Sequence, residues 1–199
     1  ANGQITTTGT LGFGASTLAI GGAAIANGDI SLDAWNGGAA PTIAIATSGT
    51  LTSHLGNANL GVLGGADIAG TLLASIADAS FTAPGATIAA TGKIAAGRDL
   101  RIGMSVDKKL VIDGNLLANR DMSLGGGTLV IGATGRVRAG QDFSFNTTDV
   151  GTGGGSIHVN DAAYDVSGAS ISAEIAGKIG AGRDLTLALA ATLIVHGRG

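Results

Sequence analysis

Short alternations of apolar and polar residues, separated by small residues, dominate the hydrophobic pattern of this chain. Residues 100–102, 128–131 and 185–187 alternate with a period of two and contain branched side chains, which is typical of short strands. Glycine and asparagine separate such segments and favour tight corners. The nearest candidate for a helix, residues 68–79, is short and shows no capped helical period. The pattern therefore predicts an all-β chain.

A nine-residue motif recurs along the chain: an apolar residue, two small residues, a glycine or asparagine, a polar residue, Asp, and then apolar-x-apolar. It is clear at 94–102, 116–124, 137–145 and 179–187, and weaker copies surround Asp29 and Asp67. The aspartates of the clear copies fall at positions 99, 121, 142 and 184, so the last interval is twice the one before it. A degenerate copy at 164–167 lies inside this double interval. A period near 21 predicts a repeat architecture.

The repeat content favours a right-handed parallel β-helix (a β-solenoid) of about 20–22 residues per coil and roughly ten coils. Successive coils of such a fold stack about 4.8 Å apart in parallel sheets, and alternate side chains fill a narrow lumen. We expect few aromatic residues there, because a ring would distort its coil. Residues 1–199 are predicted to form a single domain, weakly repetitive over 1–92 and clearly repetitive over 93–199.

Composition supports a folded chain. Hydrophobic residues make up 45% and the net charge is only −3, whereas disordered chains combine low hydrophobicity with strong self-repulsion. The 36 glycines show no Gly-X-Y period, which excludes collagen. No apolar run approaches the roughly 20 residues of a membrane helix. Without cysteine, and without a basic cluster at a pI near 5.4, the sequence predicts no thiolate metal site and no nucleic-acid partner.

Charge is unevenly distributed. All eleven Lys and Arg residues lie from Lys93 onward, and residues 1–92 carry only four charged residues, which are Asp29, Asp33, Asp67 and Asp78. Two interpretations of this bare half remain open. It could pack against a partner, since exposed surfaces are normally charged, or it could present a surface of hydroxyls and small residues to solvent.

Residues 92–102 and 177–187 share Gly-Lys-Ile-x-Ala-Gly-Arg-Asp-Leu followed by x-Ile or x-Leu. This pattern resembles the repeats of filamentous-haemagglutinin-like exoproteins, large bacterial adhesins secreted by the two-partner route, and the similarity extends over about residues 90–199. The resemblance implies a β-helix outside a Gram-negative cell, extracellular or at the cell surface. The chain is much shorter than such exoproteins and lacks a recognisable N-terminal secretion domain. It is therefore interpreted as a fragment of a longer rod or as a short relative that polymerises.

The recurring aspartates Asp99, Asp121, Asp142 and Asp184 are the most prominent candidate residues. We predict that each caps a corner by accepting backbone N–H groups, as Asx turns do. An arginine precedes three of them (Arg98, Arg120 and Arg183) and would offset repulsion between neighbouring coils. The alternative is an acidic file like the catalytic sets of β-helical polysaccharide-degrading enzymes.

We predict no catalytic, cofactor-binding or metal-binding residue. His54, His158 and His196 are far apart, and a metal site needs several ligands together. Residues 156–161 hold Ser, His and Asp along one extended segment without a nucleophile elbow. The glycine-rich calcium nonapeptide is absent. Trp35, flanked by polar loop residues, is interpreted as a packed loop anchor, with a sugar-stacking platform as the alternative.

Together these features predict a structural or adhesive rod rather than an enzyme, with self-association, head-to-tail or lateral, and a host-cell or glycan ligand as partners. Residues 192–199 still resemble strand and turn, so we expect that end to continue or to dock on another subunit, because natural solenoids cover their open edges. The alternatives are a carbohydrate-active enzyme on the same scaffold, which would need convergent carboxylates and aromatic rings, and a passive sheath or filament subunit.

Overall fold

The computed structural model describes residues 3–35, 41–105, 108–126, 128–132 and 134–146, and beyond them the segments 157–159, 173–175, 179–180, 184–188 and 193–195. Every regular element in these residues is a β-strand, so the prediction of an all-β chain is confirmed. The strands form three parallel sheets, which we name A, B and C in the order in which each turn visits them.

Each sheet takes every third strand of the chain. Sheet A contains β1 (Gln4–Thr7), β4 (Ala23–Ala26), β7 (Thr50–Ser53), β10 (Thr71–Ala74), β13 (Lys93–Ala96), β16 (Asn115–Ala118), β19 (Arg136–Ala139) and β23 (Ile179–Gly180). Sheet B contains β2 (Leu11–Ala15), β5 (Ile30–Ala34), β8 (Ala58–Val62), β11 (Ala79–Ala83), β14 (Leu100–Met104), β17 (Met122–Gly125), β20 (Phe143–Asn146) and β24 (Leu185–Ala188).

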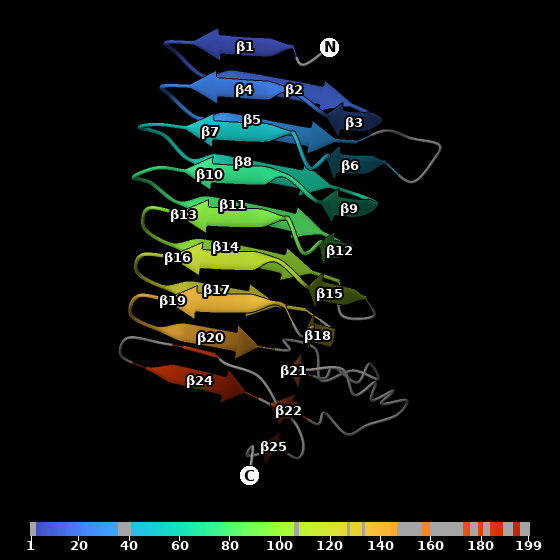
Figure 1. Ribbon diagram of the computed structural model, residues 1–199, viewed down its shortest axis with the longest axis vertical. Coiled ribbons are helices and arrows are strands. Elements are labelled where there is room, and N and C mark those ends of the chain that lie inside the picture. The colour runs from blue at the N-terminus through green and yellow to red at the C-terminus, as the bar shows by residue number, and fades with distance from the viewer. Residues whose placement is uncertain are drawn as a thin grey trace.

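Sheet C closes each turn. It contains β3 (Thr17–Ile20), β6 (Thr42–Ile45), β9 (Gly65–Ile68), β12 (Gly85–Ile88), β15 (Lys109–Ile112), β18 (Thr128–Ile131), β21 (Ile157–Val159), β22 (Ala173–Ile175) and β25 (Leu193–Val195). Sheet A strands lie in front in Figure 1 and run opposite to the sheet B strands behind them, while the chain descends, which is a right-handed coil. The molecule is a β-solenoid.

The register of the sheets reproduces the sequence period. Thr50 pairs with Thr71, and Thr71 pairs in turn with Lys93, so each partner lies one period further along the chain. Each turn therefore stacks equivalent residues over one another. Residues 68–79, the nearest candidate for a helix, contain the turn into β10 and the strand itself.

The described turns are fewer than the ten coils expected. Sheets A and B contain eight strands each within the described residues. The main reason is the double interval after Asp142, because β20 pairs directly with β24, and Asp184 N–H donates to the Asp142 carboxylate across that interval. In sheets A and B the interval therefore adds no turn of its own. The degenerate copy at 164–167 lies outside the described residues.

The lumen is built from columns of identical or similar side chains. One column in sheet C consists of isoleucines, which are Ile20, Ile45, Ile68, Ile88, Ile112 and Ile131. All but Ile20 are at most 1% exposed. Burying an aliphatic side chain of this size contributes roughly 1.5–3 kcal/mol, so these columns supply much of the folding free energy.

Aromatic rings do enter the lumen, contrary to the expectation from sequence. Phe81, Phe143 and Phe145 are each at most 1% exposed and point inward from sheet B. The turn that holds Phe81 has alanines (Ala79, Ala83 and Ala86) where the next turn has Leu100, Met104 and Leu110. Exchanging large for small side chains within one layer keeps the packing dense without distorting the coil.

Glycine occupies the corner between sheets C and A, where successive turns approach most closely. A Cβ atom on Gly92 or Gly114 would collide with a carbonyl oxygen of the preceding turn. The same holds for the equivalent corner residues, which are Gly22, Gly49, Gly70 and Gly135. The high glycine content therefore reflects a steric requirement of stacking as well as turn conformation.

Candidate functional site

The corner between sheets A and B carries the recurring aspartates, and their carboxylates link one turn to the next. The Asp78 carboxylate accepts the Asp99 N–H at 3.2 Å, the Asp99 carboxylate accepts the Asp121 N–H at 3.4 Å, and the Asp121 carboxylate accepts the Asp142 N–H at 3.2 Å. A second link runs in the opposite direction, because Leu100 N–H donates to the Asp121 carbonyl at 2.9 Å. The prediction that these aspartates accept backbone N–H groups at corners is confirmed for Asp99, Asp121 and Asp142, but the N–H groups belong to the next turn and not to an Asx turn.

This row of hydrogen bonds between corner residues, which we call the ladder, continues into the sparsely charged first half of the chain. Asn57 N–H donates to the Asp29 carboxylate at 2.7 Å, and Asp78 N–H donates to the Asn57 side-chain oxygen at 3.2 Å. Asn57 therefore occupies the ladder position of its turn. Asp67, interpreted from sequence as a weak copy of the motif, does not lie in the ladder. It lies on β9, where its exposed side chain points outward from sheet C.

Arginines bind the ladder carboxylates of the preceding turn. Arg98 donates two hydrogen bonds of 3.0 Å to Asp78, and Arg120 donates two of 3.0 Å to Asp99. The hydrogen bonds from Arg98 lower the pKa of Asp78 below its usual value, although partial burial opposes the shift. Asp99 is only 7% exposed, and its two hydrogen bonds from Arg120 offset part of the cost of burying the carboxylate. The expected offset of carboxylate repulsion is confirmed for Arg98 and Arg120, and Arg183 lies outside the described residues.

Other sequence candidates are brought to no common site within the described part of the chain. His54 lies exposed at the corner between sheets A and B, the side chain of His158 is not described, and residues 160–161 and His196 are outside the described residues. Trp35 is 65% exposed, so the interpretation of Trp35 as a packed anchor is wrong. Its indole lies beside Gly14 of the preceding turn and leaves most of the ring uncovered.

Trp35 belongs to a row of apolar residues along the corner between sheets B and C. It directly follows β5, Leu63 directly follows β8 and Pro84 directly follows β11, so the three occupy equivalent places in successive turns. Leu63 is 69% exposed. We call Trp35, Leu63 and Pro84 the corner ridge.

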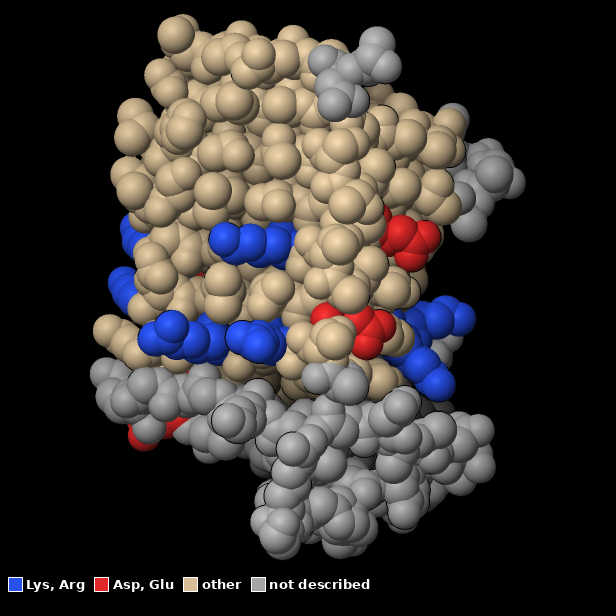
Figure 2. Space-filling model, in the orientation of Figure 1, with Lys and Arg blue, Asp and Glu red and all other residues tan. Residues whose placement is uncertain are grey.

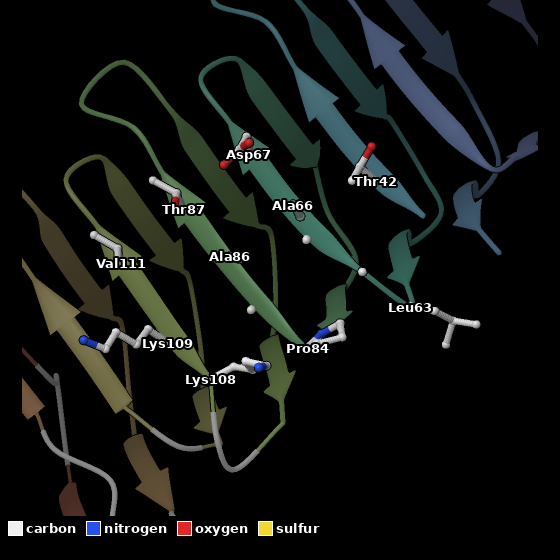
Figure 3. Close-up of a pocket in the computed structure, with 13 residues that line it drawn as sticks. Thr42, Leu63, Ala66, Asp67, Pro84, Ala86, Thr87, Lys108, Lys109 and Val111 are labelled. Carbon is white, nitrogen blue, oxygen red and sulfur yellow. The ribbon is translucent and has the colours of Figure 1, made fainter. Parts of the chain in front are cut away.

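A hollow of about 570 Å³ lies on the outer face of sheet C beside this ridge (Figure 3). Its floor is made by Gly65 and Gly85, which pair with each other across β9 and β12. In the same outward column Thr42 lies on one side of the two glycines and Lys109 on the other. The hollow exists because two successive turns lack a side chain at this position. We call it the sheet C hollow.

The walls of the sheet C hollow combine three kinds of side chain. Leu63 and Pro84 of the corner ridge supply apolar surface, Thr42 and Thr87 supply hydroxyls, and the charged groups are Asp67, Lys108 and Lys109. Figure 3 shows Asp67 and Thr87 along one side and the two lysines together at one end. A smaller hollow of about 350 Å³ on the sheet B side shares Leu63 and Pro84.

Sequence reasoning did not find the sheet C hollow. Its signal is a glycine at the same outward position of two neighbouring turns, which can be recognised only when the register of sheet C is known. A Cβ on Gly65 would meet no atom within 4 Å, whereas a Cβ on Gly85 would lie 3.2 Å from the Lys109 carbonyl oxygen. Gly65 is therefore the position at which the hollow can be filled without disturbing the fold.

Within the described residues, no group of three or more His, Asp or Glu side chains is arranged to hold a metal ion. The same residues include no helix with the length and apolar character needed to span a bilayer. A scan of protein-family models, a search of curated proteins and a search of solved structures each find no match to this chain.

Proposed function

We propose that this protein is an extracellular structural and adhesive rod, as the filamentous-haemagglutinin-like resemblance implies. The proposal rests on one observation, which is that the recurring charged residues bind groups of neighbouring turns. Asp29, Asp78, Asp99 and Asp121 accept backbone N–H groups of the next turn, and two of them also bind an arginine. The charges that recur along the chain thus serve the stacking of turns, and the sides of the rod are free to make contacts.

The adhesive contact is proposed to lie at the sheet C hollow and the corner ridge, with an oligosaccharide as the ligand. The C–H face of a sugar ring packs on apolar surfaces such as Leu63 and Pro84, and its hydroxyls need hydrogen-bonding partners such as Thr42, Thr87 and Asp67. The exposed ring of Trp35 adds a surface for stacking at the same corner. The volume of about 570 Å³ falls in the range of small-ligand sites.

The carbohydrate-active enzyme is the competing function. Glycoside hydrolysis uses a pair of carboxylates on either side of the scissile bond. The described lining of the sheet C hollow brings in one carboxylate, that of Asp67. We therefore favour binding without turnover at this place.

Self-association is proposed to extend the rod. In the first described turn the inward side chains are less covered than their equivalents in the next turn. Ile5 is 48% exposed, and Leu11 and Phe13 are only partly buried, whereas Ile30 and Leu32 are fully buried. A further turn of β-solenoid, from the same chain or from another copy, would cover these side chains. A passive sheath subunit would self-associate in the same way but would bind no saccharide.

The test uses a printed array of neutral and acidic oligosaccharides and the whole chain. Gly65→Phe should fill the sheet C hollow and reduce binding at least tenfold, while Gly12→Phe is the matched control. Gly12 is an outward, exposed position of sheet B where a Cβ also meets no atom within 4 Å.

Equal binding by the two variants, or no binding by the parent chain, would contradict the adhesive site. Release of shortened products from a bound polysaccharide would favour the enzyme. Electron microscopy of the concentrated protein tests the rod separately, since only dispersed single particles would argue against self-association.

A further inference from the structure

The outer face of sheet A differs from the other two faces in its charge. Its outward positions from β1 to β19 carry no acidic residue. They are Gln4, Thr6, Ala23, Ile25, Thr50, Thr52, Thr71, Leu73, Lys93, Ala95, Asn115, Leu117, Arg136 and Arg138. Sheets B and C, by contrast, expose Asp33 and Asp67. We call this set of residues the sheet A face.

Three cations of the sheet A face have no ion-pair partner within the described residues. They are Lys93, Arg136 and Arg138, whereas Arg98 and Arg120 at the adjoining corner bind Asp78 and Asp99. Lys93 and Arg136 lie in one column, two strands apart with Asn115 between them, which corresponds to about 9.6 Å. Arg136 and Arg138 are two residues apart on β19, about 6.6 Å along the strand.

Aliphatic side chains lie in the second column of the same face. Ile25, Leu73 and Leu117 point outward and are partly buried, and Leu117 lies directly between Ala95 and Arg138. In Figure 2, which views this side of the molecule, the upper turns are free of charge, and basic residues cross the lower described turns, with acidic residues beside them toward the right-hand edge. The face is thus extended, uncharged from β1 to β10 with threonines and aliphatic side chains, and cationic from β13 to β19.

We propose that the sheet A face binds an anionic lipid surface. A bilayer is a flat array of phosphates, and each Lys or Arg close to such a surface contributes about 1 kcal/mol, or a factor of about five in affinity. Aliphatic groups beside the cations add contact with the headgroup region. A flat partner fits better than a single polyanionic strand, because the two hollows described above lie on sheet C and beside the corner ridge.

This contact is independent of the oligosaccharide site. The sheet A face and the sheet C hollow lie on different sheets, so a rod could lie on a membrane by one side and bind a saccharide by another. Gly65→Phe should therefore leave lipid binding unchanged, and this result keeps the two proposals separable.

The experiment measures flotation of the whole chain with vesicles of phosphatidylcholine containing about a third phosphatidylglycerol, in low salt. The double variant Arg136→Gln/Arg138→Gln should bind about 25-fold more weakly, since two cations are removed. Lys108→Gln/Lys109→Gln is the matched control, because it removes the same formal charge from the sheet C side. That variant should bind within about twofold of the parent, because its charges face away from the bilayer.

Three results would overturn the proposal. The first is an equal loss of vesicle binding in the two double variants, and the second is equal binding of the parent to vesicles of pure phosphatidylcholine. The third is binding to soluble dextran sulfate that is as tight as binding to vesicles and equally sensitive to Arg136→Gln/Arg138→Gln. The last result would identify a flexible polyanion as the partner. Equal urea unfolding midpoints of the variants establish that differences in binding do not come from unfolding.

Discussion

The turns before β13 and the turns from β13 onward have the same lumen and the same corner hydrogen bonds, but they manage charge differently. In the later turns Asp99, Asp121 and Asp142 continue a row that Asp78 begins, and arginines of the later turns bind Asp78 and Asp99. In the earlier turns Asn57 separates Asp29 from Asp78. Carboxylates about 4.8 Å apart repel each other by about 1 kcal/mol even in water.

This difference shows two solutions to one electrostatic problem. A neutral amide makes the same hydrogen bonds as a carboxylate and interrupts the row of negative charges, so no arginine is needed. A continuous row of aspartates needs cations at its side. The hydrogen bonds between turns are therefore the common stabilising element, and the ion pairs compensate for the charge that those bonds bring with them.

The largest effect is expected in the lumen, where the two regions should behave alike. Leu60→Ala in the earlier region and Leu124→Ala in the later region each remove a side chain that is at most 2% exposed. Each should lower the free energy of unfolding by about 2–5 kcal/mol. Urea denaturation followed by circular dichroism measures both. A loss in only one of the two variants would mean that the lumen is not continuous.

Substitutions at the ladder position should lower the free energy of unfolding by different amounts in the two regions. Asp99→Ala removes the two hydrogen bonds from Arg120 and the acceptor of the Asp121 N–H, and should cost about 2–3 kcal/mol, since hydrogen bonds to charged groups are the stronger ones. Asn57→Ala removes only neutral hydrogen bonds and should cost about 1 kcal/mol. Unfolding free energies of the two variants provide the comparison. Equal costs would show that the arginine contributes nothing.

Making the earlier region acidic should reveal the repulsion directly. Asn57→Asp would connect Asp29 to the row of carboxylates without adding an arginine, and should destabilise the protein by about 1 kcal/mol in low salt. The effect should shrink in high salt, because exposed charges are screened. Asn57→Ser is the neutral control and should show little dependence on salt. A salt-independent loss in Asn57→Asp would point to a steric cause.

The smallest effect is expected in the loss of stability at acidic pH. The pKa of Asp78 is lower in the folded protein than its usual value of 3.8. Its ion pair with Arg98 therefore contributes fully above about pH 5, and this contribution is lost as the pH falls through the lowered value.

Asp78→Asn removes this dependence. Between pH 7 and pH 2 the parent should lose more stability than Asp78→Asn, as measured by urea midpoints, and the difference should arise below about pH 4. Identical acid profiles would mean that Arg98 and Asp78 do not pair in solution.

Much of the fold could be predicted from sequence because a solenoid repeats its local rules. The period of about 21, the alternation within strands and the aspartate of the corner are each visible in the sequence of single turns. The position of Asp67 was predicted wrongly because its surroundings resemble the corner motif, and only the pairing of β9 with β12 places it on an outer face. The filamentous-haemagglutinin-like resemblance stays a prediction.

The sequence by itself determined that the chain is all-β, that its turns stack with one regular period, and that aspartates occupy the corners, because these features depend on neighbours within one turn. The tertiary structure alone decided which residues of different turns meet. It paired Asp142 with Asp184 across the double interval, left Trp35 exposed, and aligned Gly65 with Gly85 to form a hollow. These outcomes depend on the register between turns and on the length of their connections, which a pattern within one turn does not contain.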